Sequence, residues 1–136
     1  MTTAQDVFDT AMGLIDEVDE VTGATDTGGT REYKSRALFI LNSLRGELYP
    51  YGAANQACPV IEDFETGIAL DDFLCQTVMP YGLASHLLLD ENPAAAAFFQ
   101  RRYEELLRRL GSARPASPDD IGRLYGGIEY GEFSRW

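Results

Sequence analysis

The stretch LDDFLCQTVMPYGLASHLLL, residues 70–89, decides the fold. Its apolar side chains recur every three or four residues, which predicts a helix that begins at Leu70 with Asp71 as its cap. So little of its surface is polar that this helix must be buried, either as the central helix of the domain or at a contact between subunits. Pro80 lies inside it and lacks a backbone donor, so we expect a kink at Met79 to Pro80 or two short helices that meet there.

A first amphipathic helix is predicted over residues 4–21, where two adjacent rows of apolar side chains repeat at helical spacing. Thr3 can cap this helix and Gly23 offers a stop. The connector 22–30, rich in glycine and threonine, is expected to be flexible. No basic residue precedes Arg31, so the outward side of the helix is a negative strip of Asp9, Asp16, Glu17, Asp19 and Glu20.

The helical period resumes at Thr30 and predicts a second helix that ends near Leu48. Pro50 pushes the residue before it out of helical geometry, and glycines and prolines recur through the stretch that follows. Residues 49–69 are therefore predicted to be a long loop, in which Val60 and Ile61 give a weak signal for a short extended piece. Loops of this length in small domains are often functional.

A fourth helix is predicted to start at Asn92 and Pro93, to end at Leu110, and to be stopped by Gly111. Glutamate and arginine four residues apart, Glu104 with Arg108 and Glu105 with Arg109, are expected to stabilise its solvated face by about 0.2–0.5 kcal/mol per pair. The predicted fold is all-α: a compact four-helix domain over residues 1–111, with a kinked and buried third helix, followed by an extended arm over residues 112–136.

Five large apolar side chains distinguish the end of the chain from a solubilising tail, which has no use for them. They are the predicted partner-binding residues Tyr125, Ile128, Tyr130, Phe133 and Trp136. We expect residues 115–136 to dock on a neighbouring copy or on another protein. Docking onto the same domain stays open as an alternative.

Composition excludes several classes of function. The chain has 136 residues, 11 of them basic and 22 acidic, and the net charge of -11 argues against sequence-independent binding of nucleic acid. Its first residues lack the regions of a signal peptide, and its longest nearly uncharged apolar run, residues 78–89, is too short to span a bilayer. We therefore expect a soluble protein with no membrane partner, in which Cys58 and Cys75 are free thiols.

No catalytic constellation is visible. The single His86 has no acidic residue three positions before it and no second histidine to share a metal, so it is expected to be a core or interface residue. Ser85 beside it is not a nucleophile, because adjacent helical side chains do not face each other. The acidic residues do not follow a calcium loop, and Gly28 and Gly29 lack the lysine of a phosphate-binding loop. We expect no metal, no cofactor and no enzymatic activity.

Two segments together resemble a known family. They are TREYKSRALFILNSLRGELYP (residues 30–50) and VMPYGLASHLLLDENPAAAAFFQRRYEELLRRL (residues 78–110), which make up about 54 of the 136 residues. They are similar to the small helical head-tail connector proteins, or head-completion adaptors, of long-tailed bacteriophages and prophages. The most specific part is PYGLASHLLLDENP, from Pro80 to Pro93. It consists of packing and capping residues and contains no reacting group.

The resemblance implies a structural subunit that assembles into a homo-oligomeric ring, often a dodecamer, beneath the portal at the capsid vertex. Such a ring binds the portal protein on one side and a neck or tail-completion protein on the other, and DNA passes through its centre without specific binding. Virion assembly would take place in the cytoplasm of the bacterial host and leave the protein in the virion neck. The arm and the loop 49–69 depart from a minimal connector, so both a portal-proximal adaptor and a later completion protein stay open.

Three physical points agree with this resemblance. The apolar third helix favours a lateral contact between subunits, an aromatic arm can become ordered on a partner, and an acidic strip that faces a channel would repel phosphates. The alternative is a stand-alone acidic protein-interaction or regulatory module that presents carboxylates to a basic partner.

Overall fold

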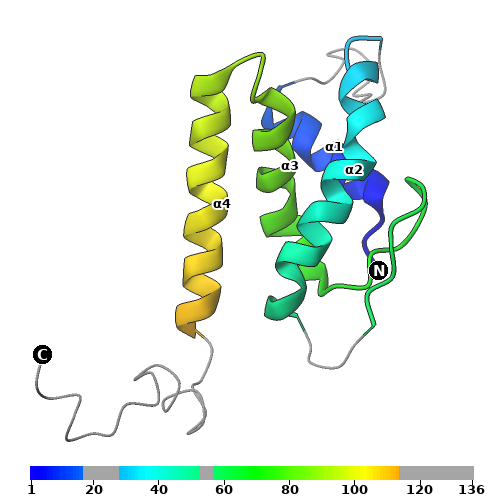
Figure 1. Cartoon of the computed structure of the whole chain (residues 1–136), viewed down its shortest axis with the longest axis vertical. Coiled ribbons are helices and arrows are strands. Elements are labelled where there is room, and N and C mark those ends of the chain that lie inside the picture. Colours follow the sequence, from blue (N-terminus) through cyan, green and yellow to red (C-terminus); the bar gives the residue numbers. More distant parts are fainter. Residues whose placement is uncertain (17–27, 53–56, 114–136) are drawn as a thin grey trace, which may run out of the picture.

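Helices are the only regular secondary structure in residues 1–16, 28–52 and 57–113, which are the residues that the computed structural model describes (Figure 1). The predicted all-α class is confirmed. The elements are α1 (Ala4–Leu14), α2 (Arg31–Leu48), the 3-10 turn η1 (Tyr49–Tyr51), the π-helical turn η2 (Leu74–Val78), α3 (Met79–Leu88) and α4 (Pro93–Ala113). None of these described helices is both long and apolar enough to cross a membrane.

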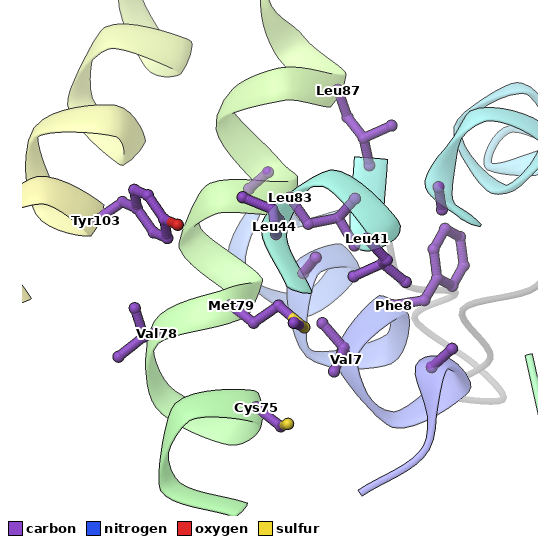
Figure 2. Packing of buried hydrophobic residues seen from close by; sticks show 14 of the residues in the cluster. Val7, Phe8, Leu41, Leu44, Cys75, Val78, Met79, Leu83, Leu87 and Tyr103 are labelled. Carbon is purple, nitrogen blue, oxygen red and sulfur yellow. The ribbon is translucent and has the colours of Figure 1, made fainter. Parts of the chain in front are cut away.

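The third helix, α3, lies at the centre of the bundle. It packs on α4 on one side and on α1 and α2 on the other (Figure 1). Eight of its ten residues are buried. Around it, side chains from all four helices form one core that includes Val7, Phe8, Leu41, Leu44, Met79, Leu83, Leu87 and Tyr103 (Figure 2).

This packing decides between the two predicted roles of the third helix. Its neighbours within one copy already remove Leu83 and Leu87 from water, with 0% and 1% of their surface exposed. The helix is therefore the central helix of the domain, because α4 covers the side of α3 that α1 and α2 leave open. This burial removes the argument for a subunit contact that rested on the apolar surface of the helix, and such a contact stays a prediction.

Gly82 allows three helices to approach one another closely. A Cβ atom at this position would lie 2.9 Å from a methyl carbon of Leu44 in α2 and 2.9 Å from a ring carbon of Tyr103 in α4. Both side chains therefore pack directly on the backbone of α3, which only glycine permits. The neighbouring buried Ser85 hydroxyl lies 2.8 Å from the Gly82 carbonyl oxygen and 3.0 Å from the side-chain oxygen of Gln100.

The predicted break at Pro80 is present as a change of helix type. The turn η2 is π-helical and passes directly into α3, and the Met79 N–H donates to the Leu74 carbonyl oxygen. A proline has no N–H to donate and its ring crowds the preceding turn. Single π turns are rare in helices, and this one lies directly before the proline-bearing start of α3. The structure thus has two short helical segments that meet at Met79 to Pro80, as predicted.

The helical stretch that leads into η2 begins at Asp72, two residues later than predicted. The Asp72 carboxylate accepts hydrogen bonds from the Thr2 N–H (3.0 Å) and the Thr2 hydroxyl (2.8 Å). These bonds lower the pKa of Asp72. Asp71, the predicted cap, contributes its backbone carbonyl, which accepts from the Cys75 N–H at 3.1 Å.

The first helix, α1, begins as predicted and ends earlier. The Thr3 hydroxyl accepts from the Asp6 N–H (3.2 Å), and the Asp6 carboxylate accepts from the Thr3 N–H (3.0 Å), which forms a capping box. The helix ends at Leu14 rather than at residue 21, and Asp16 has a φ of 62°, in the left-handed region. Several acidic residues follow Leu14 without a basic residue to offset them, and negative charge is unfavourable at this end of a helix.

Parts of the predicted first region lie outside the described residues. They are Glu17, Asp19 and Glu20 of the acidic strip, the stop at Gly23 and residues 22–27 of the connector.

Residues 57–70 are non-helical, as predicted for the long loop, and they cover the start of α1. The Ala4 N–H donates to the Thr66 carbonyl (3.2 Å) and the Gln5 N–H donates to the Phe64 carbonyl (2.8 Å). Amides in the first turn of a helix have no partner within that helix. The loop supplies those partners and is thereby tied to the core.

The fourth helix, α4, has the predicted start and continues past the predicted end. The Asn92 side-chain oxygen accepts from the Ala95 N–H at 3.2 Å, and Pro93 is the first helical residue. The helix runs through Gly111 to Ala113. A glycine in an exposed helix costs about 0.5–1 kcal/mol relative to alanine, which is too little to end a long helix. The prediction that Gly111 stops the helix is therefore wrong.

Candidate interaction surfaces

The predicted partner-binding residues lie outside the described part of the chain. They are Tyr125, Ile128, Tyr130, Phe133 and Trp136. Within the described residues, a different set of large apolar side chains is exposed: Met1, Phe39, Tyr49, Val60, Phe73, Leu89 and Phe98.

One candidate surface is the side of α4 that faces away from α3. Phe99 and Tyr103 on the opposite side of the helix are buried, whereas Phe98 is 55% exposed. Arg101 and Arg108 continue the outward stripe at helical spacing and are exposed. We define the outer face of α4 as Ala94, Ala97, Phe98, Arg101 and Arg108.

Glu105 lies between Arg101 and Arg108 on the same stripe of α4, and it pairs with two other arginines. Glu105 is engaged by Arg109 at 2.8 Å and by Arg102 at 3.3 Å. Glu104, predicted to pair with Arg108, accepts a hydrogen bond from Gln100 at 3.1 Å instead. Of the two predicted ion pairs, only Glu105 with Arg109 is therefore present. Arg101 and Arg108 have no ion-pair partner in the part of the chain that the structure describes.

A second candidate surface lies on the far side of the molecule, where the loop 57–70 covers α1 and α2 (Figure 1). Glu62 and Glu65 are exposed there, and their carboxylates have no partner among the described residues. Val60 is 59% exposed, and Phe39 of α2 is 81% exposed. We define the loop flank as Phe39, Val60, Glu62 and Glu65.

Asn42 of α2 holds the loop flank in place. Its side-chain oxygen accepts from the Ile61 N–H (2.8 Å), and its side-chain nitrogen donates to the Ile61 carbonyl (3.0 Å). Arg45 adds a hydrogen bond to the Cys58 carbonyl at 2.7 Å. Ile61 is consequently buried, at 3% exposure, while Val60 before it remains exposed. The two hydrogen bonds of Asn42 give this part of the loop one defined conformation.

The ring of Phe64 fixes the loop further along. It packs edge-on against Phe8 of α1, with 5.8 Å between the ring centroids. The Lys34 ammonium of α2 lies 4.8 Å from the centroid of the Phe64 ring, within the range of a cation–π contact. Glu65 is the next residue after Phe64. Its backbone is therefore fixed by the contacts of Phe64 with α1 and α2.

An open groove of about 460 Å³ lies at the end of the bundle where α3 passes into α4. Leu88 and Phe99 give it an apolar wall, and the Tyr33 hydroxyl donates to the Glu91 carboxylate within it. Its polar groups are carboxylates, an amide and a phenol, a set that can bind a ligand and contains no nucleophile of the cysteine or serine type. In the described residues, no group of three or more His, Cys, Asp or Glu side chains is arranged to hold a metal ion.

His86 and Ser85 point to different surroundings. Ser85 is buried between α3 and α4, whereas His86 is exposed. The prediction of a core histidine is therefore wrong, because Ser85 and not His86 lies on the side of α3 that faces α4. A role of His86 at an interface stays a prediction.

Both cysteines are free thiols, as predicted. Cys75 is buried in the core, and this burial is the main cause that raises its pKa to about 12, with the Asp72 carboxylate adding to the effect. Such a thiol remains protonated at neutral pH and is not a nucleophile. Cys75 is thus a packing residue, and only the half-buried Cys58 is open to reagents.

The Tyr103 hydroxyl is buried without a hydrogen-bond partner among the described residues. Burial raises the pKa of Tyr103, and the Glu47 carboxylate raises it further, although the geometry between the two groups falls short of a hydrogen bond. An unsatisfied buried hydroxyl costs about 1–3 kcal/mol. The ring of Tyr103 offsets this cost by filling the space beside Gly82.

Sequence reasoning missed both the outer face of α4 and the loop flank. A signal for the outer face was present in the tandem Phe98 and Phe99, because adjacent helical residues point about 100° apart and only one of them can face the core. The spacing of Phe99 with Tyr103 identifies it as the buried one. The loop flank had no local signal, because it depends on the pairing of Asn42 with Ile61, 19 residues away.

Comparisons of the chain with protein-family models, with curated proteins and with solved structures found no match.

Proposed function

We propose that the chain is a structural subunit of a bacteriophage or prophage head-tail connector, which joins a portal ring to the tail and leaves a passage for DNA. The observation that carries this proposal is the run PYGLASHLLLDENP, residues 80–93, which resembles the corresponding run of connector proteins. In this chain the run comprises nearly all of α3, the turn to α4 and the first residue of α4. The resemblance therefore concerns the hairpin at the centre of the bundle.

The residues of this run have definite structural roles. Pro80 lies where the π-helical turn gives way to α3, and Gly82 allows Leu44 and Tyr103 to pack on the backbone. Asn92 caps α4. A protein that shares these residues can build the same hairpin, which supports relating the chain to the small helical connectors.

Two surfaces support a role in assembly. The outer face of α4 and the loop flank each combine an exposed aromatic ring, Phe98 or Phe39, with charged groups that have no partner among the described residues. Single exposed apolar residues are common on proteins and need no explanation. Two surfaces that each join an aromatic ring to unpaired charge offer every copy two places of contact.

The charge of the chain suits a protein that surrounds DNA without gripping it. A net charge of -11 opposes the neutralisation of phosphates on which sequence-independent affinity depends. DNA would therefore slide past such a subunit. In this proposal the aromatic residues of segment 115–136 add contacts to the portal or to a tail-completion protein.

The proposal is tested by co-expressing the full chain with the portal protein of the same genetic element. We expect the two proteins to co-purify and negative-stain images to show rings. Deletion of residues 115–136 is the matched variant: it should leave the helix content measured by circular dichroism nearly unchanged and weaken the complex with the portal. A chain that stays monomeric and has no affinity for the portal contradicts the proposal.

Gene order gives an independent test. Genes for a portal, a capsid protein, a protease and tail proteins beside this gene would support the proposal. Metabolic genes on both sides would speak against it.

A second candidate function, an acidic module that binds a basic partner, is favoured by one observation. Residues 16–26 contain five acidic and no basic residues. Neutralising Asp16, Glu17, Asp19 and Glu20 would abolish partner binding by such a module. A connector that uses the outer face of α4, the loop flank and segment 115–136 would lose little.

A further inference from the structure

We propose that successive copies of the chain bind one another side to side, with the outer face of α4 of one copy on the loop flank of the next. This inference rests on the proposed function, because it names the contact through which a ring of connector subunits would close. The partner that binds at each of the two surfaces is a second copy of the same chain.

The two surfaces lie on opposite sides of the molecule. The outer face of α4 points away from α3, and α3 separates α4 from α1 and α2 (Figure 1). The loop flank rests on the other side of that pair, through Asn42 of α2 and through the contact of Phe64 with Phe8 of α1. One copy can therefore contact two neighbours at once.

The surfaces are complementary in charge. Arg101 and Arg108 on the outer face of α4 and Glu62 and Glu65 on the loop flank are all exposed and without ion-pair partners among the described residues. The loop itself is acidic, because residues 57–72 carry five acidic residues and no basic one, and α4 carries four arginines against two glutamates. The contrast is one between α4 and the loop, because α2, which supplies Phe39 of the loop flank, also carries four basic and two acidic residues. Charges of opposite sign on two surfaces steer those surfaces together and fix their register.

The surfaces also match in their apolar parts. Phe98 on α4 is flanked by exposed alanines, which leave a shallow apolar strip of about 6 Å along the helix axis between Ala94 and Phe98. On the loop flank, Phe39 lies one helical turn before Asn42, and Val60 directly precedes Ile61, which Asn42 binds. Aromatic side chains at the centre of an interface contribute a large share of its binding energy.

Self-contact of either surface is disfavoured. Two outer faces of α4 would place arginine against arginine, and two loop flanks would place glutamate against glutamate. The remaining arrangement is heterologous, and a heterologous contact on opposite sides generates a closed ring or an open filament. The charge distribution therefore selects the kind of contact that a ring requires.

The inference is tested by charge reversal on each surface of the full-length chain. Variant one carries Arg101→Glu and Arg108→Glu, and variant two carries Glu62→Lys and Glu65→Lys. Arg31→Glu and Asp90→Lys, exposed residues outside both surfaces, are the matched controls. Sedimentation velocity over a range of concentrations measures self-association, and circular dichroism checks that each variant is folded.

We expect the wild-type chain and the controls to self-associate, and each reversed variant to do so at least about tenfold more weakly, because like charges then face each other. Association of the wild-type chain should also weaken in about 1 M salt, where the screening length falls to about 3 Å. Mixing variant one with variant two is the decisive arm. The reversed outer face of variant one then meets the reversed loop flank of variant two, and association between the two variants should be restored.

The failures of the inference and of the proposed function are distinguishable. If both reversed variants assemble as well as the wild-type chain, the inference is overturned and the connector proposal is unaffected. If the wild-type chain self-associates through these surfaces but never binds a portal, the connector proposal fails and the contact stands. A wild-type chain that remains monomeric, alone and with the portal, overturns both.

Discussion

The helices α3 and α4 follow each other in the chain, yet α3 is almost fully buried and α4 exposes one side to water. Leu83 and Leu87 of α3 are shielded by helices on both sides of it, whereas α4 is covered on one side only and exposes Phe98 on the other. Within α3 only His86 is exposed, whereas α4 has a continuous exposed side. The apolar content of a helix thus predicts how deeply the helix is buried, but it does not predict which elements bury it.

The largest expected difference is between alanine substitutions at Leu83, in the core, and at Phe98, on the outer face of α4. The quantity compared is the free energy of unfolding. Leu83→Ala should lower the free energy of unfolding by about 2–5 kcal/mol, because it leaves a cavity at the centre of the core. Phe98→Ala should lower it by at most about 1.5 kcal/mol, because the ring is 55% exposed and its ring contact is the edge-to-face one with Phe99, 5.5 Å between centroids. Urea unfolding of dilute, monomeric samples measures both values. Equal losses would mean that the outer face of α4 is covered within one copy.

A smaller effect is expected from adding one methyl group to a glycine. Gly82→Ala places a Cβ atom against Leu44 and Tyr103 and should destabilise the protein by about 1–3 kcal/mol through overpacking. Gly46→Ala in α2, where the added carbon meets no atom within 4 Å apart from the adjacent backbone of its own helix, should stabilise it by about 0.5–1 kcal/mol. Thermal unfolding compares the two variants. A stabilising Gly82→Ala would contradict the close approach of α2 and α4 to the backbone of α3.

The cap of α4 should contribute about 1 kcal/mol. Asn92→Ala removes the side-chain oxygen that accepts from the Ala95 N–H, and such losses cost about 0.5–2 kcal/mol. Asn92→Asp keeps the acceptor and serves as the control. If the two variants unfold at the same denaturant concentration, the side chain of Asn92 does not stabilise the start of the helix.

The two cysteines should differ in how fast a thiol reagent labels them. A thiol reagent should label Cys58 quickly in the native protein at about pH 8, and Cys75 only as the protein unfolds, because the thiolate is the reactive form. Rapid labelling of both residues would show that the core around Cys75 admits solvent.

The buried thiol of Cys75 should make the protein less stable at alkaline pH. The pKa of Cys75 is raised from 9.0 to about 12 on folding, so the folded state holds its proton more tightly than the unfolded state. The resulting stability is fully present below pH 9 and is lost as the pH rises toward 12. Cys75→Ala should remove this part of the alkaline loss of stability in urea unfolding measured at several pH values. If the free energy of unfolding of Cys75→Ala falls with alkaline pH as steeply as that of the wild-type chain, the prediction is wrong.

Local patterns predicted the parts of the fold that depend on neighbouring residues. The helical period of α2, the break at Pro80 and the caps at Thr3 and Asn92 were all visible, because each rests on contacts within one turn. The end of α1 could not be predicted from such local patterns. Apolar spacing continued beyond Leu14, and the unfavourable charge at the helix end outweighed it.

The remaining features depend on residues far apart in the sequence. Residues that cover α3 come from helices on either side of it in the chain, so its apolar period predicts burial but leaves open whether this domain or a neighbouring subunit covers it. The position of Val60 and Glu62 depends on hydrogen bonds from Asn42 to Ile61 between them. Periodicity within one segment contains no information about such pairings. The predicted partner-binding residues Tyr125 to Trp136 lie outside the described residues.

A ring of these subunits requires that the outer face of α4 of one copy meets the loop flank of the next. Cysteine cross-linking tests it directly: Ala97→Cys on the outer face of α4 and Val60→Cys on the loop flank are placed in separate chains, both with Cys58→Ser, and a short bismaleimide is added. We predict covalent dimers when the two variants are mixed and none when either is treated alone. Dimers from Ala97→Cys alone at the same yield as from the mixture, or no cross-link in the mixture, would contradict the claim.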